Sequence, residues 1–293
     1  MVQLTTESRN QETLDIDKLD GVGIAELINQ EDHVVADAVA TQSKEIGAAI
    51  EAIAKRFHDG GRIIYMGAGT SGRLGALDAI ELTPTYSVSP KRAFGMLAGG
   101  ERAMYAAVEG AEDSKELALE DLKKQNLVAG DVVIAIAASG RTPYAISALE
   151  YGNKVGALTV SVTCTADNAM MKVAQIAISP VVGPEVITGS TRMKAGTAQK
   201  MVLNTISTGV MVKMGYVYSN LMINVQPTNE KLVHRSEGIL MQILDIDGES
   251  ASKLLQNAGK NVSAAIIMHK KDVSKDEAED LLREHDNRVS EII

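Results

Sequence analysis

The chain has 293 residues, 45% of them hydrophobic, which suffices for a sizeable core in one large domain or in a large and a small one. Its formal net charge of −9 at pH 7 argues against binding to nucleic acid or to an anionic membrane. Tryptophan is absent and aromatic residues make up 3%, which disfavours lectins and single-strand binders because both usually use flat aromatic platforms.

Cysteine, histidine and the amino terminus limit the compartment and the chemistry. Cys164 is the only cysteine, so an intramolecular disulfide and a thiolate zinc site are excluded. The 5 histidines have no spacing typical of metal ligands, and we expect no metal. The first residues lack the basic start and apolar stretch of a secretory signal, and no run of about 18 apolar residues occurs. We therefore expect a cytoplasmic protein.

In chain order, a polar arm precedes helices and a first strand. Residues 1 to about 22 are polar and predict an irregular arm. Apolar side chains recur at helical spacing over residues 24–29 and 32–57, which predicts helices there. Residues 62–66 are mostly apolar and lie between glycines, as is typical of a buried strand.

Short strands then alternate with helices up to residue 180. Expected helices cover residues 72–80, 100–109, 114–125 and 143–153, with an irregular stretch at 82–85. Expected strands cover residues 131–137, 158–162 and 175–178. This alternation indicates an α/β fold with a doubly wound parallel sheet flanked by helices. Ligands bind beyond the carboxyl ends of the strands in such sheets.

A helical pattern without strands continues to the carboxyl terminus. A long helix is expected over residues 193–214, and from about residue 240 three short amphipathic helices predict a small helical domain. The predicted organisation is an N-terminal arm with helices over residues 1–52, an α/β domain over 53–216, a connecting helical segment over 217–240 and a small C-terminal helical domain over 241–293.

Two turns rich in glycine and hydroxyl side chains predict a phosphate ligand. Residues 67–72 read GAGTSG and residues 139–142 read SGRT, and each turn follows a β-branched run and begins an expected helix. In the second turn, Thr142 suits the N-cap and Pro143 the first helical position. Free backbone N–H groups and the helix dipole favour an anion at such a turn. Two turns of this kind suggest that one phosphorylated ligand is held from two sides.

The first turn also matches the GxGxxG fingerprint of dinucleotide-binding proteins. That fold needs an acidic residue about 20 residues further on, where it binds the ribose. Residues 86–92, YSVSPKR, contain no acidic residue. We therefore expect neither a nicotinamide nor a flavin cofactor.

Three acidic side chains and one long polar run lie near these turns. Glu81 ends the helix that follows the first turn, where the helix dipole disfavours a carboxylate. Glu109 and Glu112 flank Gly110, which permits an unusual backbone turn, although a solvated loop before a capped helix has the same pattern. Residues 183–197, GPEVITGSTRMKAGT, gather hydroxyls and two cations at a helix start. They indicate a third anion-facing or acid-positioning element, or an N-capped helix with chance charges.

At these positions the sequence resembles the family of the N-acetylmuramic acid 6-phosphate etherases, which have the sugar isomerase (SIS) fold. The likeness is carried by GAGTSGR at residues 67–73 with Asp78, Ala79 and Glu81, by AVEGAED at 107–113, and by a long signature at 183–200. Segments at residues 6–10 and 229–232 extend it over essentially the whole chain, with slight departures at residues 80 and 82–83. The long signature is shared with the glucokinase regulatory protein, which is longer and has a duplicated SIS core.

The resemblance implies a lyase of peptidoglycan recycling. Such an enzyme cleaves the D-lactyl ether at C3 of N-acetylmuramic acid 6-phosphate and gives N-acetylglucosamine 6-phosphate and D-lactate. Water is the co-substrate and no cofactor is expected. The family's general acid matches Glu81 and its general base matches Glu112. Our hypothesis is that dry surroundings and the unfavourable helix end keep Glu81 protonated.

The remaining expected site residues bind the substrate. We expect the phosphate to be bound by Ser139, Gly140, Arg141 and Thr142, although Arg141 also fits a surface position. We expect Thr70 and Ser71 to bind the sugar or to share in binding the phosphate. We expect Ser190, Thr191, Arg192 and Lys194 to contact the N-acetyl group or the lactyl carboxylate.

Two questions about partners and function stay open at this point. SIS enzymes commonly form homodimers with sites near the subunit interface, so Glu7, Arg9 and Asn10 of the arm either reach across to a partner or belong to a frayed tail. The alternative function is a non-catalytic sugar-phosphate-binding regulatory protein. An aldose–ketose isomerase is a third possibility, because it would use the same phosphate site and remove a C2 proton.

Overall fold

We describe residues 5–225 and 230–293 of the chain in a computed structural model. Asn229, the first residue of the segment at 229–232 that resembles the family, therefore lies outside the described residues. The chain divides into two compact units, Met1–Ile80 with Lys91–Ser207 and Glu81–Pro90 with Thr208–Ile293. The four-part division of the sequence given above stays a prediction.

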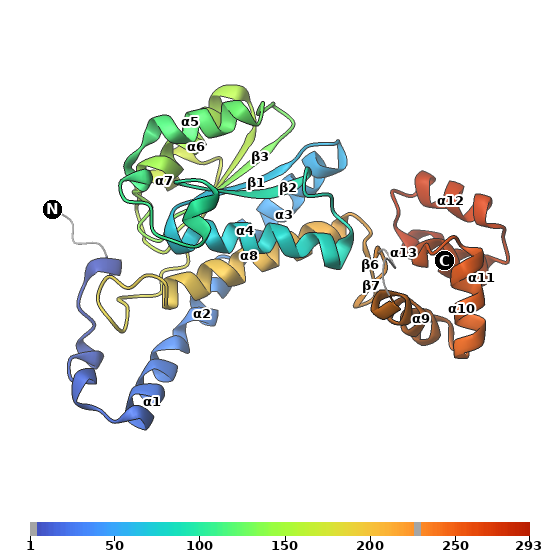
Figure 1. The fold of residues 1–293 in the computed structure, drawn as a ribbon, viewed down its shortest axis with the longest axis horizontal. Helices are drawn as coiled ribbons and strands as arrows, with labels where there is room; N and C mark the ends of the chain where they lie inside the picture. Colours follow the sequence, from blue (N-terminus) through green and yellow to red (C-terminus); the bar gives the residue numbers. More distant parts are fainter. Residues whose placement is uncertain (1–4, 226–229) are drawn as a thin grey trace. The chain divides into compact units, whose positions relative to one another are not determined.

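A five-stranded parallel sheet forms the centre of the first unit (Figure 1). Its strands are β1 (Ile63–Gly67), β2 (Ala93–Leu97), β3 (Val132–Ile136), β4 (Leu158–Val162) and β5 (Ile176–Ile178). The order is β2-β1-β3-β4-β5, and every neighbouring pair is parallel. Strands β1, β3 and β4 are buried along their whole length, as a sheet covered on both faces requires. The predicted α/β class is confirmed.

Helices cover both faces of this sheet. They are α3 (Ser43–His58), α4 (Gly69–Tyr86), α5 (Lys115–Lys124), α6 (Pro143–Val155), α7 (Ala169–Val173) and α8 (Lys194–Lys213). In Figure 1, α5 and α6 lie on one face, whereas α4 and α8 run along the other. Leu122 of α5 and Tyr144 of α6 pack with Ile64 and Val133 of the sheet in one apolar cluster. The expected helices at 114–125, 143–153 and 193–214 are confirmed.

The amino-terminal arm is more ordered than its polar sequence predicts. It forms three short 3-10 helices, η1 (Thr5–Glu7), η2 (Gln11–Thr13) and η3 (Ile16–Lys18), before α1 (Gly21–Asp32) and α2 (Val34–Ala40). Asn10 caps η2, since its side chain accepts from the backbone N–H of Glu12 at 3.0 Å. The hydroxyl of buried Thr13 donates to the carbonyl of Val186 at 2.8 Å. The arm therefore packs on its own chain.

Three local predictions are wrong. Helix α4 continues through residues 82–85 and Pro84 to Tyr86, because buried Leu82 and Tyr86 pack its last turn and offset the hydrogen bond that proline cannot donate. The expected helix at 100–109 is only the 3-10 helix η4 (Glu101–Met104). The expected helix at 32–57 is interrupted at residues 41–42, where Thr41 bonds back to the preceding turn through its hydroxyl and its backbone N–H.

The second unit is mainly helical, but the prediction that no strand follows the long helix is wrong. It contains the hairpin of β6 (Val217–Tyr218) and β7 (Leu221–Met222), and the helices α9 (Glu230–Leu244), α10 (Gly248–Asn257), α11 (Val262–Lys271), α12 (Lys275–Glu284) and α13 (Val289–Ile292). The three amphipathic helices expected after residue 240 correspond to α10, α11 and α12, whose N-caps are Asp247, Asn261 and Ser274. Among the described residues, no helix is long and apolar enough to cross a membrane.

Candidate active site

The two glycine turns lie side by side at the carboxyl edge of the sheet. The first follows β1 and the second follows β3, and these strands pair with Gly67 opposite Ile136. From β1 the chain passes first to β2 on one side and then to β3 on the other, so the strand order reverses between the two turns. In doubly wound sheets this reversal point is where ligands bind.

Close packing explains the glycines of the first turn. A Cβ atom on Gly67 would lie 2.8 Å from the backbone nitrogen of Gly72, and one on Gly72 would lie 2.4 Å from the carbonyl oxygen of Gly67. Neither position therefore accepts a side chain. Gly69 has φ +51° with open space around it, and it begins α4. Ser71 in the same turn donates its hydroxyl to Oε1 of Gln199 in α8 at 3.0 Å, so this hydroxyl binds the scaffold.

The second turn rests on a buried amide. Gly140 has φ +64°, and a Cβ atom there would lie 2.3 Å from the side chain of Asn168. Asn168 is itself buried, and its Nδ2 donates to the carbonyl of Thr165 at 2.6 Å and to the hydroxyl of Thr163 at 3.0 Å. The hydroxyl of Ser139 accepts from the backbone N–H of Arg141 at 3.3 Å. These contacts fix the backbone of the turn.

The start of α6 follows the prediction in part. Thr142 occupies the N-cap position and Pro143 is at the first helical position, but the Thr142 side chain makes no capping hydrogen bond. Arg141 is exposed, while Ser139 and Thr142 are half-buried. The side chains of the second turn are thus accessible at the edge where a ligand is expected.

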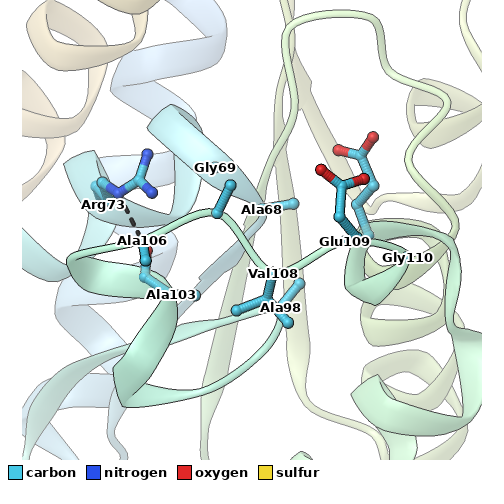
Figure 2. A pocket seen from close by; sticks show the side chains of 11 residues that line it. Ala68, Gly69, Arg73, Ala98, Ala103, Ala106, Val108, Glu109 and Gly110 are labelled. Carbon is cyan, nitrogen blue, oxygen red and sulfur yellow. Dashed lines mark hydrogen bonds between the residues drawn. The ribbon is translucent and has the colours of Figure 1, made fainter.

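A pocket of about 220 Å³ opens beside the first turn (Figure 2). Its lining comes from the end of β1, the start of α4 and the segment after β2: Ala68, Gly69, Arg73, Ala98, Ala103, Ala106, Ala107, Val108, Glu109, Gly110 and Glu112. The backbone N–H of Ala98 donates to the carbonyl of Gly67 at 3.0 Å and so extends the β1–β2 pairing to the pocket. Most of the lining side chains are small, which leaves the pocket open. Its three ionisable side chains, Arg73, Glu109 and Glu112, can take part in binding or catalysis.

Gly110 explains why Glu109 and Glu112 line the same pocket. It has φ +72° and forms the N-cap of η5 (Ala111–Asp113), so the chain turns sharply between the two acids. Both carboxylate side chains are exposed. Both interpretations of this segment agree with the structure, because Gly110 has a positive φ and Ser114 caps α5 by accepting from the backbone N–H of Leu117 at 3.1 Å.

Arg73 is a pocket residue to which the sequence analysis gave no role. Its Nε donates to the carbonyl oxygens of Ala103 and Met104, at 3.1 Å each. This contact ties the segment after β2 to α4. Arg73 follows Gly69 by four residues, and this helical spacing places both on one face of α4, which could have indicated its position.

Glu81 has surroundings that differ from those expected. It is exposed, it lies five residues before the end of α4, and it is not among the residues that line the pocket. The prediction of a dry helix end is therefore wrong, because α4 continues past Pro84. The acid that α4 buries is Asp78, which accepts hydrogen bonds from Tyr65, Asn204 and Ser207.

The long signature run caps α8. Glu185 is buried, and its two carboxylate oxygens accept from the backbone N–H groups of Lys194 and Ala195, at 2.9 Å each. Burial raises the pKa of this carboxyl above its ordinary value despite the two hydrogen bonds. Lys194 is buried too, and its Nζ forms an ion pair with Glu31 at 2.6 Å.

The structure brings together only part of the expected site. Of the predicted residues, Glu112 lines the pocket. The others are not among its lining: Thr70, Ser71, Glu81, Ser139, Gly140, Arg141, Thr142, Ser190, Thr191, Arg192 and Lys194. Ser190 and Thr191 are half-buried and Arg192 is exposed. In the part of the chain that the structure describes, no group of three or more His, Cys, Asp or Glu side chains could hold a metal ion.

Comparisons with known proteins agree with this architecture. The profile of the glucokinase regulatory protein N-terminal SIS domain matches residues 45–153, and that of the SIS domain matches residues 105–208. The chain is 62% identical to N-acetylmuramic acid 6-phosphate etherase 1 of Enterococcus faecalis, over 99% of this chain and 97% of that one. It is 55% identical to the N-acetylmuramic acid 6-phosphate etherase of Lactobacillus johnsonii, with the same coverage. An E. coli protein whose structure was solved as a complex shares the fold, with a TM-score of 0.51 and 17% identity over 69% of this chain and 97% of that one.

Proposed function

Because this chain belongs to the family of the N-acetylmuramic acid 6-phosphate etherases, we propose that it cleaves the D-lactyl ether of N-acetylmuramic acid 6-phosphate. The products are N-acetylglucosamine 6-phosphate and D-lactate, and the pathway is peptidoglycan recycling. The observation that carries the proposal is 62% identity over 99% of the chain, which extends through both glycine turns and the segment with Glu112.

Elimination followed by water addition makes this cleavage accessible to ordinary side chains. An ether oxygen is a poor leaving group. In the ring-opened sugar, however, the C1 aldehyde acidifies the proton on C2. A base removes that proton, the C3–O bond breaks, and an acid protonates the departing lactate oxygen. Water then adds to C3 of the unsaturated aldehyde, so no redox cofactor is required.

Two glutamates take the roles of base and acid. Glu112 is the base at C2, and its exposed carboxylate in the pocket beside Gly69 supports this assignment. Glu81 is the acid at the lactate oxygen, an assignment that rests on its place in the family motif. Glu81 is exposed and lies outside the pocket lining, so the structure adds no further support to this role.

The turn at residues 139–142 binds the phosphate, and Thr70 assists at the sugar. Support comes from the position of both turns at the point where the strand order reverses, and from the fixed backbone at Gly140. Ser190, Thr191 and Arg192 contact the N-acetyl group or the lactyl carboxylate. We assign Lys194 to the scaffold instead, because its ammonium is buried against Glu31.

The enzyme acts as a cytoplasmic homodimer in this proposal. The buried free thiol of Cys164 is compatible with a reducing compartment. Glu7 and Arg9 are exposed on the arm and are available to a second subunit, whereas Asn10 is buried and its Nδ2 donates to Glu31 at 2.6 Å within its own chain. Deleting residues 1–12 tests the arm, because a stable dimer with full activity would give it no catalytic part.

Incubation with N-acetylmuramic acid 6-phosphate, followed by a D-lactate assay, tests the proposed reaction. Release of D-lactate supports it. The match of residues 45–153 to a regulatory-protein domain favours one alternative, a sugar-phosphate-binding regulator. Binding of the substrate without release of D-lactate would support that alternative and contradict the etherase proposal.

A further inference from the structure

The pocket that contains Glu112 presents a charge problem for the proposed substrate. Glu109 and Glu112 both line it, so two carboxylates face the space. The lactyl group is attached at C3, next to the C2 carbon where Glu112 acts, and it carries a carboxylate of its own. Three like charges in one pocket repel one another, and a bound lactyl group therefore needs a cation nearby.

Arg73 is the one cationic side chain among the described residues that line this pocket. It is half-buried, and the two hydrogen bonds from its Nε to Ala103 and Met104 hold the guanidinium in place. Its two terminal nitrogens have no hydrogen-bonding partner among the residues that the structure describes. Figure 2 shows Arg73 on α4 and Glu109 on the opposite side of Ala68 and Gly69. The side chain is thus positioned in advance and free to bind an anion.

We propose that Arg73 binds the carboxylate of the lactyl group and selects substrates that carry it. This inference rests on the proposed function. A guanidinium held through Nε still offers its terminal N–H groups in the fork geometry that matches a carboxylate. Arg73 therefore offsets the repulsion from Glu109 and Glu112 and orients the leaving group at C3. It is a specificity-determining residue, distinct from the phosphate-binding turn at 139–142.

The role predicts a difference between two ligands. N-acetylmuramic acid 6-phosphate carries the lactyl carboxylate, whereas N-acetylglucosamine 6-phosphate has the same sugar and phosphate without it. Arg73→Met should lower kcat/KM for N-acetylmuramic acid 6-phosphate at least about tenfold, the usual range for a charge-assisted bidentate contact. Its Kd for N-acetylglucosamine 6-phosphate should stay within about twofold of that of the unaltered protein. Arg73→Lys keeps the charge but loses the fork geometry of the guanidinium. Its kcat/KM for N-acetylmuramic acid 6-phosphate should therefore lie between those of Arg73→Met and the unaltered protein.

A substrate variant tests the contact without altering the protein. Converting the lactyl carboxylate to an amide should lower kcat/KM of the unaltered protein at least about tenfold, measured as formation of N-acetylglucosamine 6-phosphate, and calorimetry gives the binding ratio wherever the ligand is not cleaved. Arg73→Met should no longer discriminate between acid and amide. Arg102→Met is the matched control, since Arg102 is exposed in η4 and outside the pocket lining, and it should keep the full discrimination.

Two outcomes overturn the inference. If Arg73→Met still prefers the acid to the amide, another group binds the carboxylate. If Arg73→Met lowers the affinity for both sugar phosphates equally, Arg73 only supports the segment of Ala103 and Met104. Failure of the unaltered protein to release D-lactate would contradict the proposed function instead, and the acid-to-amide binding ratio would still decide the role of Arg73.

Discussion

The hydroxyl of Tyr65 in β1 donates to Oδ2 of Asp78 in α4 at 2.7 Å, and both residues are buried. The other carboxylate oxygen of Asp78 accepts from Nδ2 of Asn204 at 2.6 Å and from the hydroxyl of Ser207 at 3.0 Å, both in α8. One buried acid thus joins a central strand to the two helices on one face of the sheet. This matters for the site, because α4 begins at Gly69 and carries Arg73.

Replacing Tyr65 with Phe should destabilise the protein by about 1–3 kcal/mol, because a buried carboxylate oxygen would lose its donor. The free energy of unfolding in urea measures this change. Tyr105→Phe is the control, since Tyr105 is 92% exposed and should stay within about 0.5 kcal/mol of the unaltered protein. Equal stability of the two variants would mean that the bond contributes nothing.

The same pair predicts a loss of stability at alkaline pH. Burial, and then the charge of Asp78, raises the pKa of Tyr65 well above its ordinary value of 10.0. A group with a raised folded pKa stabilises the protein fully below its unfolded pKa, near 10, and this contribution is lost as pH rises toward the folded pKa. The unfolding free energy should therefore fall above about pH 10. Tyr65→Phe should fall less steeply, and an unchanged slope would exclude Tyr65 as a cause.

Substituting Glu81 and substituting Glu112 should have different effects on deuterium exchange at C2. Glu81→Gln should stop D-lactate release but keep deuterium exchange at C2, because the base Glu112 is intact. Glu112→Gln should lose both activities. Mass spectrometry of recovered substrate measures the exchange. Glu116→Gln is the control, as an exposed carboxylate in the first turn of α5 outside the pocket. Loss of exchange in Glu81→Gln would contradict the division of roles.

The strands next to the glycine turns could be predicted because β-branched runs between glycines leave few alternatives. Strand β2 could not, because Gly95 interrupts its short sequence, AFGML. The structure gives the reason for this glycine, since a Cβ atom there would lie 2.4 Å from Cα of Ala76 in α4. This close approach between distant segments leaves no periodic signal, and the pocket between α4 and the segment after β2 depends on it.

In the candidate site too, contacts between distant segments of the chain could not be predicted from the sequence. Gly110 permits the sharp turn that the structure shows, but its local pattern also fits a solvated loop, and the role of Glu112 is expected only from the resemblance to the family. Helical spacing from Gly69 could have indicated the position of Arg73 but not its role, since that role depends on carbonyl oxygens of Ala103 and Met104, about 30 residues away in the chain. The surroundings of Glu81 could not be predicted either, because Pro84 indicates a helix end whereas tertiary packing continues α4 through it.

The serine of the second turn should affect substrate binding more than stability. Ser139→Ala should raise KM at least about tenfold, as loss of a hydrogen bond to a charged phosphate predicts, while the melting temperature stays within a few degrees. Steady-state kinetics with N-acetylmuramic acid 6-phosphate measures this. An unchanged KM would remove the turn from the site. Gly130→Ala is a control for a small change at the opposite end of β3, because nothing lies within 4 Å of a Cβ atom at that position.

Lys194 distinguishes a scaffold role from a substrate contact. Its ion pair with Glu31 is buried, so Lys194→Met should leave that carboxylate without its counter-ion, with the Asn10 amide as its remaining donor, and cost about 3–5 kcal/mol of unfolding free energy. The double variant Lys194→Met with Glu31→Leu removes both charges and should recover much of that loss, because an apolar pair of similar volume often replaces a buried ion pair without penalty. Urea unfolding of the single and double variants gives the coupling energy between the two side chains. A raised KM with unchanged stability in Lys194→Met would instead place the ammonium on the substrate, as the sequence alone suggests.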